Sequence, residues 1–355
     1  MEPDLTKVSP GRREVLEKIA LYESERRFDE DVENDPPTKP LLPDQVDYLN
    51  KKLGSRIKTA IANTIGDHYF TKLIKKGIIQ IEGVEGKENL SALQHGAVVT
   101  CNHFSAYDNY ILFEGIRNEL PRKYLYKVIR EGNYTSFPGL YGFLFKHCNT
   151  LPLSSNRRTM MNMLSAVNTL LTRGESILIY PEQGMWWNYR KPRPLKIGGF
   201  RMAYRAGVPV VPMLITMRHG DELDGDGYPL QIYTLHILPP VYPDKSLGEK
   251  LGAEQMKEKN YELWKEKYEE VYKVPLDYGP AAKEKAAGEA GDFDDYSRVR
   301  LPSDSGEYDF CRTRFRVRLL VRFKGGAAER RRRDCRGRAF RFPDPPPARQ
   351  MVRAR

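Results

Sequence analysis

The chain of 355 residues is long enough for one large or two modest domains, and 40% of its residues are apolar, which supports a buried core. The net charge of +11 does not make the body a basic nucleic-acid binder. Residues 311–355 hold 15 Arg and one Lys against three Asp or Glu, so the remainder is close to neutral. The charged N-terminus lacks a signal-peptide core, and no uncharged apolar run approaches the ~18 residues of a spanning helix.

Cysteine usage favours a reduced compartment. Cys101, Cys148, Cys311 and Cys335 show neither close pairing nor metal-type spacing. Because His, Cys and carboxylates form no ligand cluster in the sequence, we expect no metal and no resident cofactor. We therefore expect a cytoplasmic protein that reaches any membrane lipid from the side.

The first 77 residues predict two helices joined by a linker. Residues 1–43 comprise a charged helix that begins after Ser9 and Pro10, followed by a stiff proline-rich segment at 35–43. Residues 44–77 return to helical period, with basic side chains mostly off the apolar face. That face consists of Leu49, Leu53, Ile57, Ile61 and Ile65. Such a helix either has an ordinary solvated face or docks on an anionic membrane.

Residues 78–278 alternate between strand and helix patterns, with Gly and Pro at the junctions. This alternation predicts an α/β fold, with a mixed sheet flanked by helices. We expect strands at 78–83, 97–101, 123–129, 150–153, 176–180, 208–217 and 230–238. A helix is expected to run to about Thr172, another to end at Gly207, and a third to span 253–272. Residues 137–145, apolar and aromatic, predict either the lining of an acyl channel or a buried loop and short helix.

An imidazole at a strand end and a nearby carboxylate predict a general base. His103 follows the apolar run at 97–101, and we expect Ser105 to cap a helix that starts near Ala106, with Asp108 in its first turn. A carboxylate that contacts an imidazole fixes its tautomer and stabilises the imidazolium. On spacing alone, a structural histidine is the more frequent case.

Three blocks in order resemble the glycerolipid acyltransferase family, which includes the lysophosphatidic acid and glycerol-3-phosphate acyltransferases. The blocks are Asn102 and His103 followed by Asp108, then Tyr-Pro-Glu-Gln-Gly at 180–184, then Val-Pro-Val-Val-Pro at 208–212. The resemblance covers about residues 78–240. It implies an α/β fold and a 1-acylglycerol-3-phosphate O-acyltransferase of phospholipid biosynthesis. Such an enzyme transfers a fatty acyl group from a thioester of coenzyme A or acyl carrier protein to the free hydroxyl of a lysophospholipid such as lysophosphatidate.

The resemblance also implies residues for the acceptor's phosphate, and here the sequence departs from the family. The family usually carries an arginine just after the apolar strand that ends near residue 153, where this chain has Ser154 and Ser155. Arg157 or Arg158 is the expected replacement, because a guanidinium group suits phosphate. The acceptor therefore stays open between lysophosphatidate and glycerol 3-phosphate.

The second block implies further acceptor contacts through Glu182 and Gly184. Amides of this turn are candidates for stabilising the oxyanion. The family's arginine is missing from this block as well, and the cations that follow either supply positive charge or belong to a solvated loop. Those cations are Arg190, Lys191, Arg193 and Lys196.

Other functions fit parts of the sequence. A hydrolase with Ser105 or Cys101 as nucleophile lacks the G-x-S-x-G pattern, whereas a thioesterase would use water with the same His103/Asp108 pair. Residues 279–355 form an arginine-rich tail that predicts disorder and, in a non-enzyme, binding to membrane or RNA. For an acyltransferase the expected partners are acyl-CoA or acyl carrier protein, a lysophospholipid and the inner membrane face, and not nucleic acid.

Overall fold

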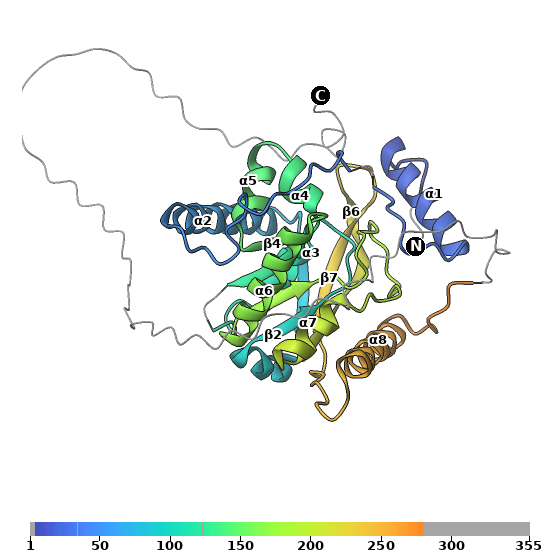
Figure 1. The fold of residues 1–355 in the computed structure, drawn as a ribbon. Coiled ribbons are helices and arrows are strands. Elements are labelled where there is room, and N and C mark those ends of the chain that lie inside the picture. Colours follow the sequence, from blue (N-terminus) through green and yellow to red (C-terminus); the bar gives the residue numbers. More distant parts are fainter. Residues whose placement is uncertain (1–3, 34, 122–123, 280–355) are drawn as a thin grey trace, which may run out of the picture.

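The computed structural model describes residues 4–33, 35–121 and 124–279, in which a seven-stranded sheet is covered by helices on both faces (Figure 1). The strands are β1 (Gln80–Glu85), β2 (Ala97–Thr100), β3 (Leu125–Ile129), β4 (Thr150–Pro152), β5 (Ser176–Ile179), β6 (Val210–Leu223) and β7 (Pro229–Ile237). Their order is β1-β7-β6-β2-β5-β3-β4. β6 and β7 pair antiparallel, and the other neighbouring strands pair parallel. The predicted α/β fold with a mixed sheet is confirmed.

Helices surround this sheet close to where the sequence periodicity predicts them. They are α1 (Pro10–Ser24), α2 (Leu53–Lys75), the 3₁₀ segment η1 (Lys87–His95), α3 (Asp108–Ile116), α4 (Glu131–Ser136), α5 (Gly139–His147), α6 (Arg157–Thr172), α7 (Gly198–Ala206) and α8 (Glu249–Tyr272). Gly207 ends α7 with φ of 71°, a conformation that glycine adopts without strain. None of the described helices is long and apolar enough to cross a membrane.

Three predicted helix starts are wrong by a few residues, and one of them is that of α8, which begins at Glu249 rather than at 253. The second helix begins at Leu53, so Leu49 precedes it and packs on the core instead. α3 begins at Asp108 rather than near Ala106, because the hydroxyl of Ser105 accepts a hydrogen bond from the amide of Tyr107 at 3.1 Å and caps a turn before the helix.

The central strand β2 is buried on both faces, which explains its unbroken apolar sequence. Successive side chains of a strand point to opposite faces. Val98 therefore packs in the cluster that contains residues of α6, α7 and α8, and Val99 packs in the opposite cluster with residues of η1 and α3. Parallel strands enclosed by helices on both sides typically read as continuous apolar runs.

The carboxyl ends of β2, β5, β3 and β4 lie at one edge of the sheet, because these four neighbours are parallel. His103 follows β2, Glu182 follows β5, Arg130 follows β3 and Ser154 follows β4. In open α/β sheets, ligands bind outside this edge. The topology thus collects polar residues from four distant parts of the chain.

The N-terminal region packs against the same edge through a separate apolar cluster. Val15 and Ile19 of α1, with Phe28 and Val32, contact a group of aromatic residues from the body of the protein. That group includes Trp186, Trp187 and Tyr228. The predicted tail at 279–355 lies, apart from Gly279, outside the described residues.

Candidate active site

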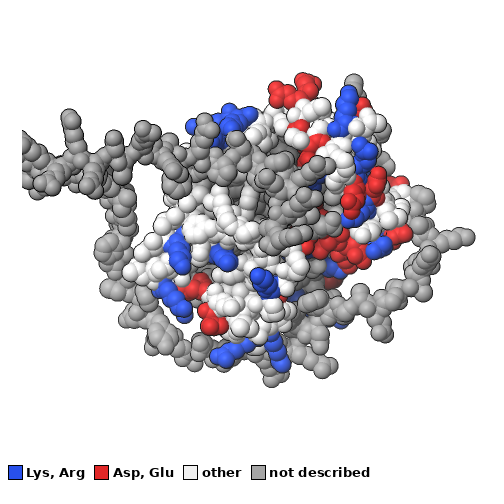
Figure 2. Space-filling view, turned by 90° about the horizontal axis from the view of Figure 1, so that it is seen from above, with Lys and Arg blue, Asp and Glu red and all other residues white. Residues whose placement is uncertain are grey.

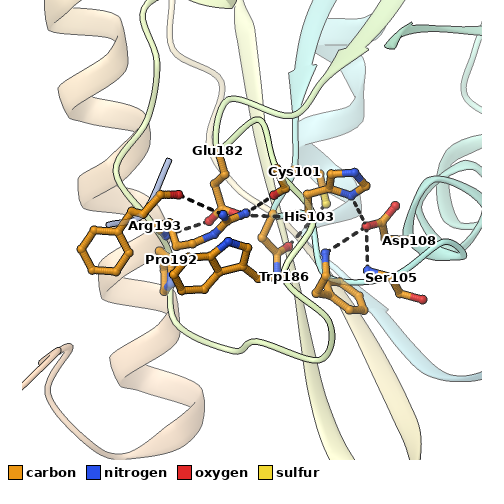
Figure 3. Close-up of polar contacts among 12 residues, drawn as sticks. Cys101, His103, Ser105, Asp108, Glu182, Trp186, Pro192 and Arg193 are labelled. Atoms are coloured by element: carbon orange, nitrogen blue, oxygen red, sulfur yellow. Dashed lines mark hydrogen bonds and ion pairs between the residues drawn. The ribbon is translucent and has the colours of Figure 1, made fainter. Parts of the chain in front are cut away.

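His103 and Asp108 form a close pair at the carboxyl edge of the sheet (Figure 3). The Nδ1 atom of His103 lies 2.7 Å from Oδ2 of Asp108. The imidazole is 22% exposed, whereas the carboxylate is fully buried. An accepting carboxylate selects the tautomer with hydrogen on Nδ1, so Nε2 carries the free lone pair. The predicted pairing of these two side chains is therefore present.

Asp108 accepts hydrogen bonds from three donors besides His103. Its Oδ2 accepts hydrogen bonds from the amides of Phe104 (3.1 Å) and Ser105 (3.2 Å), and its Oδ1 accepts one from the Tyr180 hydroxyl (2.6 Å). Its place at the first residue of α3 adds the positive end of the helix dipole. These contacts satisfy the acceptors of a buried carboxylate and fix its position against the imidazole of His103.

Tyr180 supports the pair from a second direction. Its ring stacks on the imidazole of His103, with centroids 4.0 Å apart and planes 16° from parallel. Burial, together with the negative charge of Asp108, raises the pKa of Tyr180 well above its usual value. The phenol thus stays protonated and remains a donor. Tyr180 belongs to the second sequence block, but the sequence alone predicts no role for it. Its contacts with His103 and Asp108 become visible only in the fold.

Glu182 has both oxygens engaged by protein groups. Oε1 accepts from the amide of Arg193 at 2.7 Å, and Oε2 accepts from the amide of His103 at 3.1 Å and from Nη2 of Arg193 at 3.1 Å. The side chains of Arg193 and Glu182 are 1% and 2% exposed. Arg193 is thus the buried ion-pair partner of Glu182 rather than part of a solvated loop. Glu182 contacts His103 through the backbone amide of His103.

Further contacts fasten this loop to the histidine block. The amide of Trp186 donates to the carbonyl of His103 at 3.1 Å, and the amide of Asn188 donates to that of Phe104 at 3.0 Å. The guanidinium of Arg193 lies 4.8 Å from the ring centroid of Trp186. Figure 3 shows Glu182, Arg193 and Trp186 on one side of His103 and Asp108 on the other.

The amides of the second block are already in use. Gln183 donates to the carbonyl of Tyr180 at 3.0 Å, and Gly184 donates to that of Glu182 at 3.1 Å. Gln183 adopts φ of 66°, which closes a tight turn. These two amides therefore do not supply the oxyanion donors that we expected from this turn.

A groove is lined by His103 and by residues of α2 and α5, among others. Its walls include apolar and aromatic residues that the sequence singled out, such as Phe137, Tyr141 and Leu144. α5 packs on α2, where the hydroxyls of Tyr69 and Tyr141 are 3.0 Å apart. Residues 137–145 thus include a short helix, and that helix also lines the groove.

The cations at the groove differ from the two that the sequence favoured. Arg157 and Arg158 are exposed at the start of α6, and neither is among the described residues that line the groove. Arg130 and Lys196 do line it. Arg130 directly follows β3, so the rule that ligands bind at strand ends would have identified it from the sequence.

The alternative nucleophiles lack the environment that they need. Cys101 is fully buried, and this burial raises the pKa of its thiol well above the usual value, so the reactive thiolate does not form. Ser105 is 6% exposed, and its oxygen accepts from the Tyr107 amide.

Asn102, the residue before His103, is also buried and has a structural role. Its side chain makes two hydrogen bonds of 2.9 Å with the backbone of Ile215 and so connects the end of β2 to β6.

Comparison with known proteins agrees with the sequence blocks. The family model described as Acyltransferase matches residues 82–216, a range that contains all three blocks. A search of curated proteins finds no match. Among solved structures, the chain is similar to the crystal structure of the 1-acyl-sn-glycerophosphate (LPA) acyltransferase PlsC from Thermotoga maritima. The TM-score is 0.41 and the identity 19%, and the likeness covers 76% of this chain and 90% of that chain.

Proposed function

We propose that the chain, whose residues 82–216 match the family model described as Acyltransferase, transfers a fatty acyl group from an acyl thioester to the free hydroxyl of a lysophospholipid such as lysophosphatidate. The observation that supports this most is the 2.7 Å contact between Asp108 and His103, which lines the groove. Coenzyme A or acyl carrier protein carries the thioester. The activity is then of the 1-acylglycerol-3-phosphate O-acyltransferase type.

His103 acts as the general base in this scheme. Its Nε2 takes the proton of the acceptor hydroxyl as that oxygen attacks the thioester carbonyl. The tetrahedral intermediate then collapses, the carbon–sulfur bond breaks, and the leaving sulfur takes the proton back from the imidazolium. Asp108 stabilises the imidazolium between these two steps. General-base assistance of this kind contributes roughly 10²–10⁴-fold in rate.

Arg130 and Lys196 are our candidates for the acceptor's phosphate. Both adjoin the turn at 181–184. The amide of Lys196 donates to the carbonyl of Pro181 at 2.8 Å, and Nη2 of Arg130 would lie 3.4 Å from a β-carbon placed on Gly184. Two cations beside one turn suit a phosphate monoester, and the guanidinium binds it through paired hydrogen bonds.

We propose that the protein reaches its lipid substrate by docking α2 on the membrane surface. Leu53, Ile57 and Ile61 of this helix are 70%, 51% and 48% exposed, although they form one apolar row. Basic residues such as Lys52 and Arg56 lie beside the row and are also exposed. An apolar row flanked by cations favours the interface of an anionic bilayer. The groove passes α2, so a lipid acceptor would enter from this side.

The test uses the full chain, lysophosphatidate and labelled oleoyl-coenzyme A. We expect phosphatidate from the wild type, a loss of roughly 10²–10⁴-fold in kcat for His103→Ala, and no change for the exposed control His95→Ala. Release of coenzyme A without a lipid product would instead identify a thioesterase. Acylation of glycerol 3-phosphate but not of lysophosphatidate would correct the acceptor.

A further inference from the structure

The acidic segment that follows α1, residues 29–33 together with Asp35, places carboxylates against the two cations that we propose for the acceptor's phosphate, Arg130 and Lys196. Nη1 and Nη2 of Arg130 donate to the two oxygens of Asp31 at 2.8 and 2.5 Å, and Asp35 lies 3.6 Å from Nη1. Nζ of Lys196 donates to Asp29 at 2.7 Å. Seen from above, acidic side chains gather on the side of the molecule where α1 lies, with basic side chains among them (Figure 2).

The contact between Asp31 and Arg130 lies next to the catalytic residues. A β-carbon placed on Gly184 would be 3.0 Å from Oδ1 of Asp31 and 3.4 Å from Nη2 of Arg130. Gly184 is two residues from Glu182, which holds the amide of His103. The carboxylate of Asp31 therefore lies beside the turn at 181–184, which holds His103 in place.

A bidentate contact between guanidinium and carboxylate has the same geometry as one between guanidinium and phosphate. We propose that Asp31 is an internal anion at the acceptor's phosphate position, so that a phosphorylated acceptor must displace its carboxylate from Arg130. Asp31 thereby sets the affinity for the acceptor. This inference rests on the function proposed above.

The backbone of the acidic segment is anchored independently of these ion pairs. Phe28 is 8% exposed and Val32 is fully buried. Nε1 of Trp186 donates to the carbonyl of Glu30 at 2.9 Å, and Arg193 donates to that of Phe28 at 3.3 Å. The side chain of Asp31, by contrast, is 48% exposed. Rotation of this side chain alone breaks the bidentate contact with Arg130 and leaves Asp35 as its remaining ion-pair partner, and the segment itself stays in place.

A phosphate monoester is able to win this competition because it carries about −1.5 to −2 charges at pH 7, against one on the carboxylate. Exposed ion pairs add little stability, so the carboxylate is readily replaced. An acceptor without a phosphate gains nothing when Arg130 is released. The internal anion thus weakens the binding of phosphorylated acceptors and leaves neutral ones unaffected.

Asp31→Asn in the full chain tests the proposal, with Glu82→Gln as a matched control. Glu82 makes an exposed bidentate contact of the same kind with Arg218, at 2.9 and 2.7 Å. We expect Asp31→Asn to lower the KM for lysophosphatidate roughly twofold to fivefold, the factor that an exposed ion pair contributes. Glu82→Gln should leave it unchanged. The KM for the neutral acceptor monoacylglycerol should be the same in all three proteins.

Calorimetric binding of lysophosphatidate without a donor separates this proposal from the proposed function. If the wild type makes no phosphatidate but Asp31→Asn binds lysophosphatidate more tightly, the acylation reaction is wrong and the internal anion stands. An unchanged or raised KM and Kd in Asp31→Asn would overturn the internal anion, because Asp31 would then only orient Arg130. Absence of binding by both proteins would overturn both proposals.

Discussion

Two ion pairs lie close to Gly184, and they differ chiefly in exposure. Nη2 of Arg130 and Nη1 of Arg193 would lie 3.4 and 3.9 Å from a β-carbon on this glycine. Arg193 and its partner Glu182 are 1% and 2% exposed, whereas Arg130 and its partner Asp31 are 38% and 48% exposed. The same chemistry is therefore present twice at one turn, once buried and once in contact with solvent.

The difference assigns the two pairs to different tasks. Removing one partner of a buried pair leaves an uncompensated charge, so the pair of Glu182 and Arg193 is a fixed support for the loop behind His103. An exposed pair exchanges its partners at little cost, because water solvates the released groups. The pair of Asp31 and Arg130 is accordingly the one that a ligand is able to replace.

The largest effect is expected from breaking the buried pair. Glu182→Gln leaves the charge of Arg193 buried without an anion, and we expect a loss of about 3–5 kcal/mol in the free energy of unfolding. Urea denaturation measures this loss. Glu82→Gln, which breaks the exposed pair with Arg218, should cost less than about 1 kcal/mol. Equal midpoints for Glu182→Gln and the wild type would remove the distinction between the two pairs.

An intermediate effect is expected where a buried charge loses one donor and keeps the others. Tyr180→Phe removes the 2.6 Å hydrogen bond to Asp108, which retains its two amide donors and His103. We expect a loss of roughly 1–3 kcal/mol in urea denaturation. Tyr124→Phe is the control at an exposed tyrosine. A loss as large as that of Glu182→Gln would show that Tyr180 contributes more than this hydrogen bond.

The comparison between buried and exposed groups also applies to the exposed apolar residues of α2. Replacing Leu53, Ile57 and Ile61 with serine should leave the fold intact, because these side chains face solvent, and should weaken binding to anionic vesicles roughly tenfold to a hundredfold. Cosedimentation with vesicles measures the change. A matched triple serine variant uses exposed residues in and after α8, namely Leu251, Val271 and Val274. Equal vesicle binding by both variants would exclude α2 as the docking helix.

The smallest effect concerns the exposed pair itself. Asp31→Asn should lower the free energy of unfolding by less than about 1 kcal/mol, no more than Glu82→Gln, because the anchors of the acidic segment remain. The same urea experiment measures it. A loss of several kcal/mol would mean that Asp31 is part of the structural frame.

The sequence predicts the elements whose periodicity is local. The buried strand before His103, the strand before Tyr180 and the stop at Gly207 follow from apolar runs and glycine, and the structure confirms them. The pairing of His103 with Asp108 was predicted too, because the two residues are five apart and lie on either side of one turn. Short separations leave the chain few ways to arrange the side chains.

Contacts across long separations were not predictable in this way. Arg130 and Asp31 are 99 residues apart, so only the packing of the acidic segment reveals that they meet. The burial of Arg193 likewise depends on Phe28, which lies 165 residues away in the chain. Proximity in sequence to β4 predicts Arg157 and Arg158 as phosphate ligands, yet they start α6 and face solvent.

The central claim is that His103 and Asp108 act as one base, and a double-mutant cycle on kcat tests it most directly. The variants are His103→Ala, Asp108→Asn and the double variant, each assayed for acylation of lysophosphatidate after circular dichroism has verified its fold. If Asp108 acts through His103, Asp108→Asn lowers kcat by roughly 10²–10⁴-fold when it is introduced into the wild type. The same substitution lowers kcat by no more than about twofold when it is introduced into the His103→Ala variant. Losses that multiply in the double variant would contradict the claim.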